Sequence, residues 1–234
     1  MTGQCNWTDA TRNKTFPAQL NMAAQCLAHP GDHIALIDLT GADRRDISYG
    51  ELAHMVDTLA AVLARQVRVG DRVGVLRSQD PWTAAAHLAI WKIGAISVPL
   101  FKLFQADALR VRIMDAQPVM IVTDPAGAKM ADGLGVTTLI PETLARHETA
   151  VPYHMTAAED PAVLIYTSGT TGLPKGALHA HRVLTGHLPG VAVSHDLLGE
   201  PGDCLWTPAD WAWIGGLFDV LMPGRAYLMA SRNP

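Results

Sequence analysis

Cysteine is scarce in this sequence: its 234 residues include only 3, at Cys5, Cys26 and Cys204. Their odd number and wide separation exclude a disulfide framework, and the absence of a C-x-x-C pair excludes a zinc-finger spacing. A chain of this length buries most of the surface that its unfolded state exposes, so it folds without disulfides or a structural metal. The cysteine usage therefore predicts a cytoplasmic protein.

An excess of positive charge is also missing, with 18 Lys and Arg against 22 Asp and Glu. The net charge of −4 and the pI near 6.2 argue against the basic face of a nucleic-acid-binding protein, so no nucleic acid is expected as a partner. The most apolar long stretch, residues 84–104, is interrupted by His87, Lys92 and Lys102, so no segment reaches the ~18 apolar residues of a membrane span. Residues 1–7 lack the apolar core of a signal peptide. With 49% hydrophobic and 17% charged residues the chain is not disordered, and we expect a soluble globular protein.

Short apolar runs alternate along the chain with segments of helical periodicity. Ser48 and Glu51 form a capping box at the start of one helix, and Asp80 and Pro81 supply the N-cap and first residue of another. Further helices are predicted at residues 107–114 and 126–132, and strands at residues 34–39, 72–76, 95–99, 119–123, 136–140 and 162–166. Strands alternating with helices at these lengths predict an α/β fold, with a mainly parallel sheet covered by helices on both faces.

This pattern divides the chain into four stretches. Residues 1–30 are polar and are expected to be irregular, and residues 31–140 form a first α/β subdomain. Residues 141–160 are polar without a periodic pattern, which predicts a linker. Residues 161–234 contain the loop described next and the start of a second subdomain.

A loop rich in hydroxyl groups and glycines follows the apolar run at residues 162–166. Residues 167–176, with the sequence T-S-G-T-T-G-L-P-K-G, hold four hydroxyl side chains, three glycines and Lys175. Glycines let backbone N–H groups approach an anion, hydroxyls add donors, and the lysine adds a positive charge, so the composition favours polyphosphate binding. A flexible connector or a tight turn remains an alternative. The common P-loop does not fit, because it needs G-x-x-x-x-G-K-[ST] and here Gly176 follows the lysine.

Residues 166–176 resemble the phosphate loop of the adenylate-forming superfamily, which includes acyl-CoA synthetases, aryl ligases and luciferases. The pattern [YF]-T-S-G-T-T-G-x-P-K-G matches at every fixed position. Residues 47–52 and 91–100 resemble the motifs that precede this loop, and residues 209–216 resemble the D-x-G-W segment of acetyl- and medium-chain acyl-CoA synthetases. The resemblance covers about residues 20–225 and implies an incomplete large N-terminal domain of the acyl-CoA synthetase type.

The resemblance implies a two-step ligase whose substrates are a small carboxylic acid, Mg-ATP and coenzyme A. The carboxylate attacks the α-phosphate of ATP to give an acyl-adenylate and pyrophosphate, and the thiol of coenzyme A then displaces AMP. The residues implied to hold the phosphates are Thr167, Ser168, Gly169, Thr170, Thr171, Gly172 and Lys175. Thr170 or Thr171 is the candidate ligand for the Mg²⁺ that ATP carries.

The resemblance also assigns an acyl pocket to Trp213, Gly215 and Gly216, where the glycines leave room for the chain and the tryptophan lines it. Core packing of Trp213 is the alternative. Residues 103–109 resemble L-F-G-x-x-A-L, near which coenzyme A binds, with Gln105 in place of the glycine. Arg110 and Arg112 are then candidates for contacts with coenzyme A phosphates, although a solvated helix face is the favoured interpretation.

Several motifs of the family are not found in this sequence. They are the Y-G-x-T-E segment, the aspartate that grips ribose, and the C-terminal domain with its catalytic lysine. We therefore expect no catalytic residue in this chain and no activity from it alone. The apolar stretch after Trp211 is expected to be exposed and to promote oligomers or aggregation. The alternative function is a non-catalytic nucleotide-binding or interaction module that keeps only the phosphate loop, and a P-loop NTPase is disfavoured by the spacing.

Three histidines have separate interpretations. His179 and His181 follow the loop at positions i and i+2, and one strand face would present both to a metal, but no third ligand lies at zinc spacing. A metal site is therefore the less favoured interpretation. His87, within an apolar helix, is expected to be a hydrogen-bonded core histidine.

Overall fold

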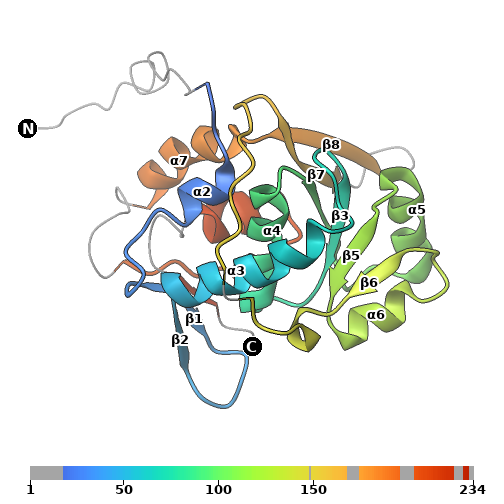
Figure 1. Ribbon diagram of the computed structural model, residues 1–234, viewed down its shortest axis with the longest axis horizontal. Coiled ribbons are helices and arrows are strands. Elements are labelled where there is room, and N and C mark those ends of the chain that lie inside the picture. The colour runs from blue at the N-terminus through green and yellow to red at the C-terminus, as the bar shows by residue number, and fades with distance from the viewer. Residues whose placement is uncertain (1–17, 148, 168–173, 196–202, 224–228, 232–234) are drawn as a thin grey trace, which may run out of the picture.

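The computed structural model describes residues 18–147, 149–167, 174–195, 203–223 and 229–231 as two sheets and their flanking helices (Figure 1). The larger sheet has the strand order β6-β5-β3-β4-β7-β8, and the smaller has the order β2-β1-β9. The strands are β1 (Ile34–Asp38), β2 (Arg45–Ser48), β3 (Arg72–Leu76), β4 (Ile96–Pro99), β5 (Met120–Thr123), β6 (Thr137–Leu139), β7 (Pro161–Thr167), β8 (Lys175–Ala180) and β9 (Met229–Ser231). The helices are α2 (Met22–Cys26), α3 (Tyr49–Leu63), α4 (Pro81–Lys92), α5 (Ala106–Ala116), α6 (Pro125–Ala131) and α7 (Val183–Ser194), with a 3₁₀ turn η1 (Pro141–Thr143) and a π-helix η2 (Gly216–Leu221).

The larger sheet confirms the predicted α/β class. Strands β3 to β7 pair in parallel, and only β8 runs antiparallel to its neighbour β7. Each of the six predicted strands is present, with ends within about two residues of the prediction, which is the usual uncertainty of element boundaries.

Helices cover both faces of this sheet. Successive residues of each strand point to opposite faces, so neighbouring residues of one strand contact different helices. In β5, Met120 and Val122 join the core formed with α3 and α4, whereas Ile121 between them joins the core formed with α5 and α6. The helix starts follow the predicted caps. Ser48 Oγ accepts from the backbone N–H of Glu51 at 3.1 Å, and the Glu51 carboxylate accepts from the Ser48 N–H at 2.8 Å.

Several regular elements were not predicted. They are β2, β8, β9, α7, η1, η2 and α2, the last of which lies within the stretch 1–30 that was expected to be irregular. Strand β2 has the polar sequence RDIS and forms only because it pairs with β1. Helix α2 has five residues, too few to show a period, and it is held by its buried Met22, Ala23 and Cys26.

The described residues of the predicted linker, 141–147 and 149–160, contain the short turn η1 and one isolated bridge from Ala157 to Gln19, and they pack against the rest of the chain. The Val151 N–H donates to the Asp57 carboxylate at 2.8 Å, and the His154 N–H donates to the Lys92 carbonyl at 2.8 Å. Beyond it, β7 pairs with β4, so the two predicted halves share one sheet. The division into subdomains stays a prediction.

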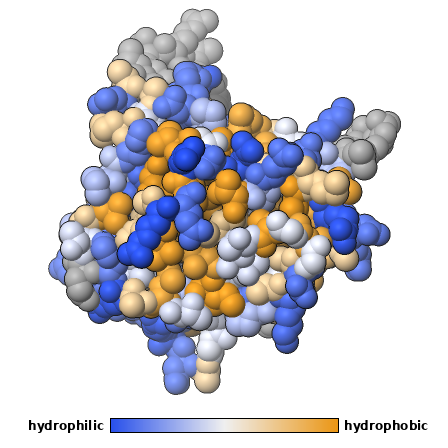
Figure 2. All heavy atoms as spheres, turned by 45° about the vertical axis from the view of Figure 1, so that its right-hand side comes forward, coloured by the Kyte–Doolittle hydropathy of each residue, from blue (hydrophilic) through white to orange (hydrophobic). Residues whose placement is uncertain are grey.

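The apolar stretch after Trp211 was expected to be exposed, and this is wrong for most of its described residues. Trp211 is buried, and so are Leu217, Phe218, Leu221 and Met222, because they pack into the core under α4 and α2. The ring centroids of Phe218 and Trp91 lie 6.1 Å apart. Large apolar side chains are exposed elsewhere, among them Leu103, Met114 and Trp206. On the face seen in Figure 2, apolar side chains gather in the middle and polar ones surround them.

Among the described residues, no helix has the length and apolar character that crossing a membrane requires.

Replacing Lys92 by alanine is expected to lower the free energy of unfolding by about 3 to 5 kcal/mol, because it leaves the carboxylate of Asp57 buried without its cation. Lys92 Nζ lies 2.6 Å from Asp57 Oδ1, and the two side chains are 4% and 12% exposed. Urea denaturation measures the loss, with the exposed Lys129→Ala as control. The double change Lys92→Met and Asp57→Leu is expected to recover part of it. Equal stability of Lys92→Ala and Lys129→Ala contradicts the prediction.

Candidate functional site

The two described ends of the predicted phosphate loop face each other across the β7–β8 hairpin. Thr167, the last residue of β7, is the register partner of Lys175, the first residue of β8, and both side chains are exposed. The predicted residues Ser168, Gly169, Thr170, Thr171 and Gly172 lie outside the described residues. The structure therefore brings together the two predicted ligands at the base of the loop, Thr167 and Lys175.

Tyr166 fixes the base of this loop to helix α5. Its ring is buried, and its hydroxyl donates to the carboxylate of Asp115 at 2.5 Å. Burial, together with this hydrogen bond to a carboxylate, raises the pKa of the Tyr166 hydroxyl, so it stays a donor at neutral pH. Opposite it stands Gly176, where a Cβ would come within 2.8 Å of the Leu164 side chain. The glycine lets the two strands pack closely at the point where the loop begins.

A small cavity of about 290 Å³ lies between α5 and Pro174 at the end of the loop. Arg112 lines it, but it does not lie on the solvated helix face that was favoured for it. Its guanidinium carbon is 3.9 Å from the centroid of the Phe104 ring, it donates to the Ala108 carbonyl at 2.7 Å, and the residue is buried. Burial lowers the pKa of this guanidinium. Gln105 has φ −65°, an ordinary extended conformation that needs no glycine.

The carboxyl ends of β3, β4, β5 and β7 meet at one edge of the sheet, because these strands are parallel. Ligands of open α/β sheets bind at this edge, in the crevice where neighbouring connections leave on opposite faces. Here β3 leads to α4 and β4 leads to α5, whose side chains contribute to the two different cores. In that crevice, Lys102 Nζ lies 2.8 Å from Asp124 Oδ2 and 3.0 Å from the Ser78 hydroxyl. Burial opposes ionisation of Asp124, but hydrogen bonds from Lys102 and from the N–H groups of Gly127 and Ser78 outweigh it and lower the pKa.

This Lys102 cluster was not identified from the sequence. The signal that could have found it is that each of the three polar residues lies within three positions of the end of a predicted strand.

The segment with Trp213 is held at the same edge. Gln79 donates to the Ala209 carbonyl at 2.8 Å, and the rings of Trp213 and Phe101 lie 5.7 Å apart. Trp213 is 43% exposed, so it does not fill the core as the alternative interpretation had it. Burial raises the pKa of Asp210. The structure thus brings the predicted acyl-pocket segment to the edge from which the phosphate loop starts.

Gly216 does not leave room for a ligand as predicted, since the chain itself fills the space. A Cβ on Gly216 would lie 2.4 Å from the carbonyl oxygen of Asp210, whereas the nearest atom to a Cβ on Gly215 would be Asp219 Oδ2 at 3.5 Å. The missing side chain of Gly216 therefore serves packing of the backbone.

The three histidines that the sequence singles out differ in burial, and no group of three or more metal-ligating side chains occurs among the described residues. His181 lies one residue beyond β8 and is buried. Its Nδ1 accepts from the Met22 N–H at 3.1 Å, and burial lowers its pKa to about 4. His179 is only partly buried. His87 is a buried histidine as expected, and burial lowers its pKa to about 3, but its Nδ1 has no hydrogen-bond partner among the described residues.

Comparison with known proteins gives consistent matches. A family profile for AMP-binding enzymes matches residues 22–226. Acetyl-coenzyme A synthetase of Magnetococcus marinus is 31% identical over a 264-residue alignment, which covers 93% of this chain and 40% of that protein. The ATP-bound structure of MatB from Rhodopseudomonas palustris has a TM-score of 0.76 and 27% identity, covering 92% of this chain and 45% of that one. The structure of acetoacetyl-CoA synthetase from Streptomyces lividans has a TM-score of 0.79 and 25% identity, and the match covers 93% of this chain and 40% of that one. The chain thus spans less than half of the length of these proteins.

Changing Gly216 to alanine is expected to lower the free energy of unfolding by about 1 to 3 kcal/mol, because the new methyl group collides with the Asp210 backbone. The matched control is Gly186→Ala in α7, where no atom lies within 4 Å of the new Cβ. There a gain of up to about 1 kcal/mol is expected from helix propensity. Urea denaturation of both variants measures the expected decrease and increase in the free energy of unfolding. A Gly216→Ala variant as stable as Gly186→Ala contradicts the close approach.

The stability of the protein is expected to fall at alkaline pH partly through Tyr166. Because folding raises the pKa of this hydroxyl above its ordinary value of 10.0, its contribution is complete below pH 10 and is lost as pH rises through the folded-state pKa. Tyr166→Phe is therefore expected to lose less unfolding free energy than the wild type between neutral and strongly alkaline pH. Urea denaturation across that range gives the comparison, and parallel pH profiles of the two proteins exclude a role for Tyr166.

Proposed function

Because the chain belongs to the family of AMP-binding enzymes, we propose that it is the phosphate-binding part of an ATP-dependent acyl-CoA synthetase. In the proposed reaction an oxygen of a carboxylic acid bonds to the α-phosphorus of ATP and pyrophosphate leaves. The sulfur of coenzyme A then bonds to the acyl carbon and AMP leaves. The observation that carries the proposal is the position of Thr167 and Lys175 at the carboxyl edge of the parallel sheet, one on each side of the loop.

The role proposed for the loop is to hold the β- and γ-phosphates while the α-phosphorus reacts. Lys175 supplies a positive charge, Thr167 a hydroxyl donor, and residues 168–172 further hydroxyl and N–H donors. Such fixed donors and charges stabilise the charge that develops on the leaving pyrophosphate. Support comes from MatB of Rhodopseudomonas palustris, which matches this fold in its ATP-bound form.

Magnesium is proposed to arrive with ATP rather than at a protein site of its own. The described residues contain no cluster of metal-ligating side chains, and the candidate ligands Thr170 and Thr171 lie outside them. When bound, Mg²⁺ neutralises phosphate charge.

The acyl group is proposed to lie near Trp213, whose ring is partly exposed beside Phe101 at the same edge of the sheet. Gly215 keeps a place in this proposal, since a Cβ there would meet only Asp219 Oδ2 within 4 Å. Coenzyme A is proposed to approach by the α5 side of the loop, where Pro174 and Arg112 line the small cavity. Arg112 holds its guanidinium over Phe104, which places a positive charge at this opening.

The 234 residues alone are proposed not to complete the reaction. The sequence contains no match to the family segments that contact adenine and ribose, nor to the catalytic lysine. It spans 40% of the length of the Magnetococcus marinus synthetase.

Lys175→Ala is expected to weaken binding of Mg-ATP at least about tenfold, because a hydrogen bond to a charged group is lost. Isothermal titration calorimetry measures the affinity, with Lys129→Ala as the control of equal charge change on α6. Equal affinities of the two variants remove Lys175 from the phosphate site.

Pyrophosphate release tests the reaction itself. The protein isolated from its source cells, with its intact mass measured, is expected to release pyrophosphate from Mg-ATP when a short or medium carboxylic acid is added. The 234-residue chain is expected to release none. A native protein that binds Mg-ATP and releases no pyrophosphate with any such acid overturns the ligase proposal in favour of a non-catalytic nucleotide-binding module.

A further inference from the structure

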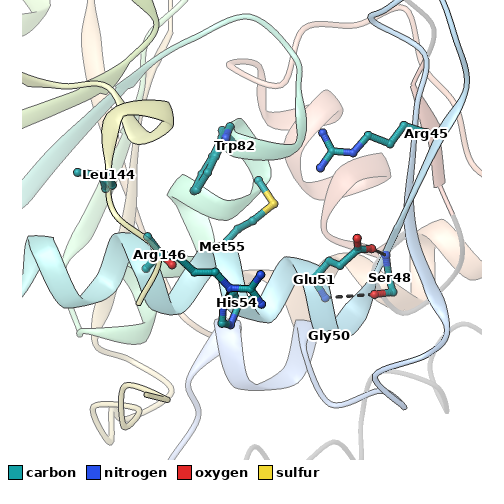
Figure 3. A pocket seen from close by; sticks show the side chains of 10 residues that line it. Arg45, Ser48, Gly50, Glu51, His54, Met55, Trp82, Leu144 and Arg146 are labelled. Atoms are coloured by element: carbon teal, nitrogen blue, oxygen red, sulfur yellow. Dashed lines mark hydrogen bonds between the residues drawn. The ribbon is translucent and has the colours of Figure 1, made fainter. Parts of the chain in front are cut away.

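A second cavity lies between β2, the first turns of α3, the start of α4 and the segment that follows η1 (Figure 3). Its volume is about 510 Å³, and small-molecule sites typically measure roughly 300 to 1,000 Å³. In Figure 1, β2 and the start of α3 lie on the opposite side of the molecule from the ends of β7 and β8. The cavity is therefore separate from the phosphate loop.

Two guanidinium groups give the cavity a positive charge. Arg45, the first residue of β2, extends its side chain toward the cavity (Figure 3). Its guanidinium takes part in none of the side-chain hydrogen bonds or ion pairs of the described residues, although its charge contributes to lowering the pKa of the Glu51 carboxyl group. Arg146 enters from the opposite side and donates its Nε–H to Nε2 of His54 (Figure 3).

One carboxylate, that of Glu51, lines the cavity, but it is engaged at the start of α3. It accepts from the Ser48 N–H, and this hydrogen bond is the main cause that lowers its pKa. The two guanidinium groups and the one carboxylate together sum to a charge of +1. The N-terminal N–H groups of α3 are themselves bonded, to His33, Gly31 and Ser48. An anion in this cavity would therefore be recognised by the guanidinium groups rather than by the helix end.

Three large apolar side chains also line the cavity, beside the polar Thr58. Met55, Trp82 and Leu144 are partly buried: they pack against the core formed with α3 and α4, and they line the cavity. Trp82 is the one partly exposed residue of α4, in which all other side chains are buried. A ligand that covers these apolar surfaces removes them from water, which favours binding. The flat indole of Trp82 favours a flat partner.

We propose that this cavity binds a small organic anion: a carboxylate held by Arg45 and Arg146, carrying a flat apolar group that rests on Trp82, Met55 and Leu144. The arrangement matches the combination of an apolar lining with a few polar groups that characterises small-molecule sites. The site does not depend on the ligase proposal, since none of its residues belongs to the loop, to the crevice at the sheet edge or to the Trp213 segment.

Calorimetry with 2-naphthoate tests the site, with the neutral 2-naphthamide as a matched ligand. One equivalent of 2-naphthoate is expected to bind, and Arg45→Gln is expected to weaken it about tenfold through loss of a charged hydrogen bond. The control Arg44→Gln removes the neighbouring guanidinium, which pairs with Asp46 outside the cavity, and is expected to leave the affinity unchanged. Met55→Trp, which fills the cavity, is expected to abolish binding.

Three results would overturn the proposal. They are equal affinity for the acid and the amide, equal affinity of Arg45→Gln and Arg44→Gln, and the absence of 2-naphthoate binding at about 1 mM. A competition experiment with saturating Mg-ATP and acetate distinguishes the proposed anion site from the ligase site. If Mg-ATP and acetate displace 2-naphthoate, then 2-naphthoate binds in the ligase site and the anion-site proposal is overturned. Failure of Mg-ATP to bind leaves this test intact, so the two proposals fail separately.

Discussion

The strand that precedes the phosphate loop depends on one buried side chain, the indole of Trp91. Its Nε1–H donates to the Ala162 carbonyl of β7 at 2.8 Å, and its ring stacks near Phe218 of η2. Its backbone carbonyl accepts from the Asn21 amide at 2.7 Å, just before α2. A buried indole needs a partner for its N–H, so the position of α4 and that of β7 are coupled. Three segments that are distant in sequence are thereby held around α4, and the base of the loop is held with them.

Charged side chains hold residues 141–160 in place through hydrogen bonds and ion pairs, whereas the strands are held by the hydrogen bonds of the sheet. This segment has almost no regular structure of its own, so its backbone groups need other partners. Asp57 supplies one by accepting from the Val151 N–H while it neutralises Lys92. Arg77 supplies a second connection, since its buried guanidinium bonds the Thr123 carbonyl and the carboxylates of Asp80 and Glu142. The path between β6 and β7 is thus fixed by side chains of α3, of α4 and of the residues that follow β3.

Elements whose signal is local could be predicted from the sequence, and those that depend on a distant partner could not. The capping box at Ser48 and the apolar run of β3 need no knowledge of the fold. Strand β2 is polar and exists through β1, and the burial of Phe218 follows from its contact with Trp91, 127 positions away in the sequence. The same holds in the site. The loop is a contiguous motif and was found, whereas Lys102, Ser78 and Asp124 follow three different strands and meet only in the folded sheet.

The cations at the carboxyl edge of the sheet differ in whether a carboxylate already neutralises them. Lys102 faces the crevice but is already paired with Asp124, and Arg77 behind it is paired with two carboxylates. Among the described residues, Lys175 has no ion pair and is exposed at the first position of β8. Exposed charges are well hydrated, so an unpaired lysine can remain there at little cost until a ligand arrives. Two of the cations near this edge, Lys102 and Arg77, are thus paired with carboxylates, whereas Lys175 is exposed and has no ion pair among the described residues.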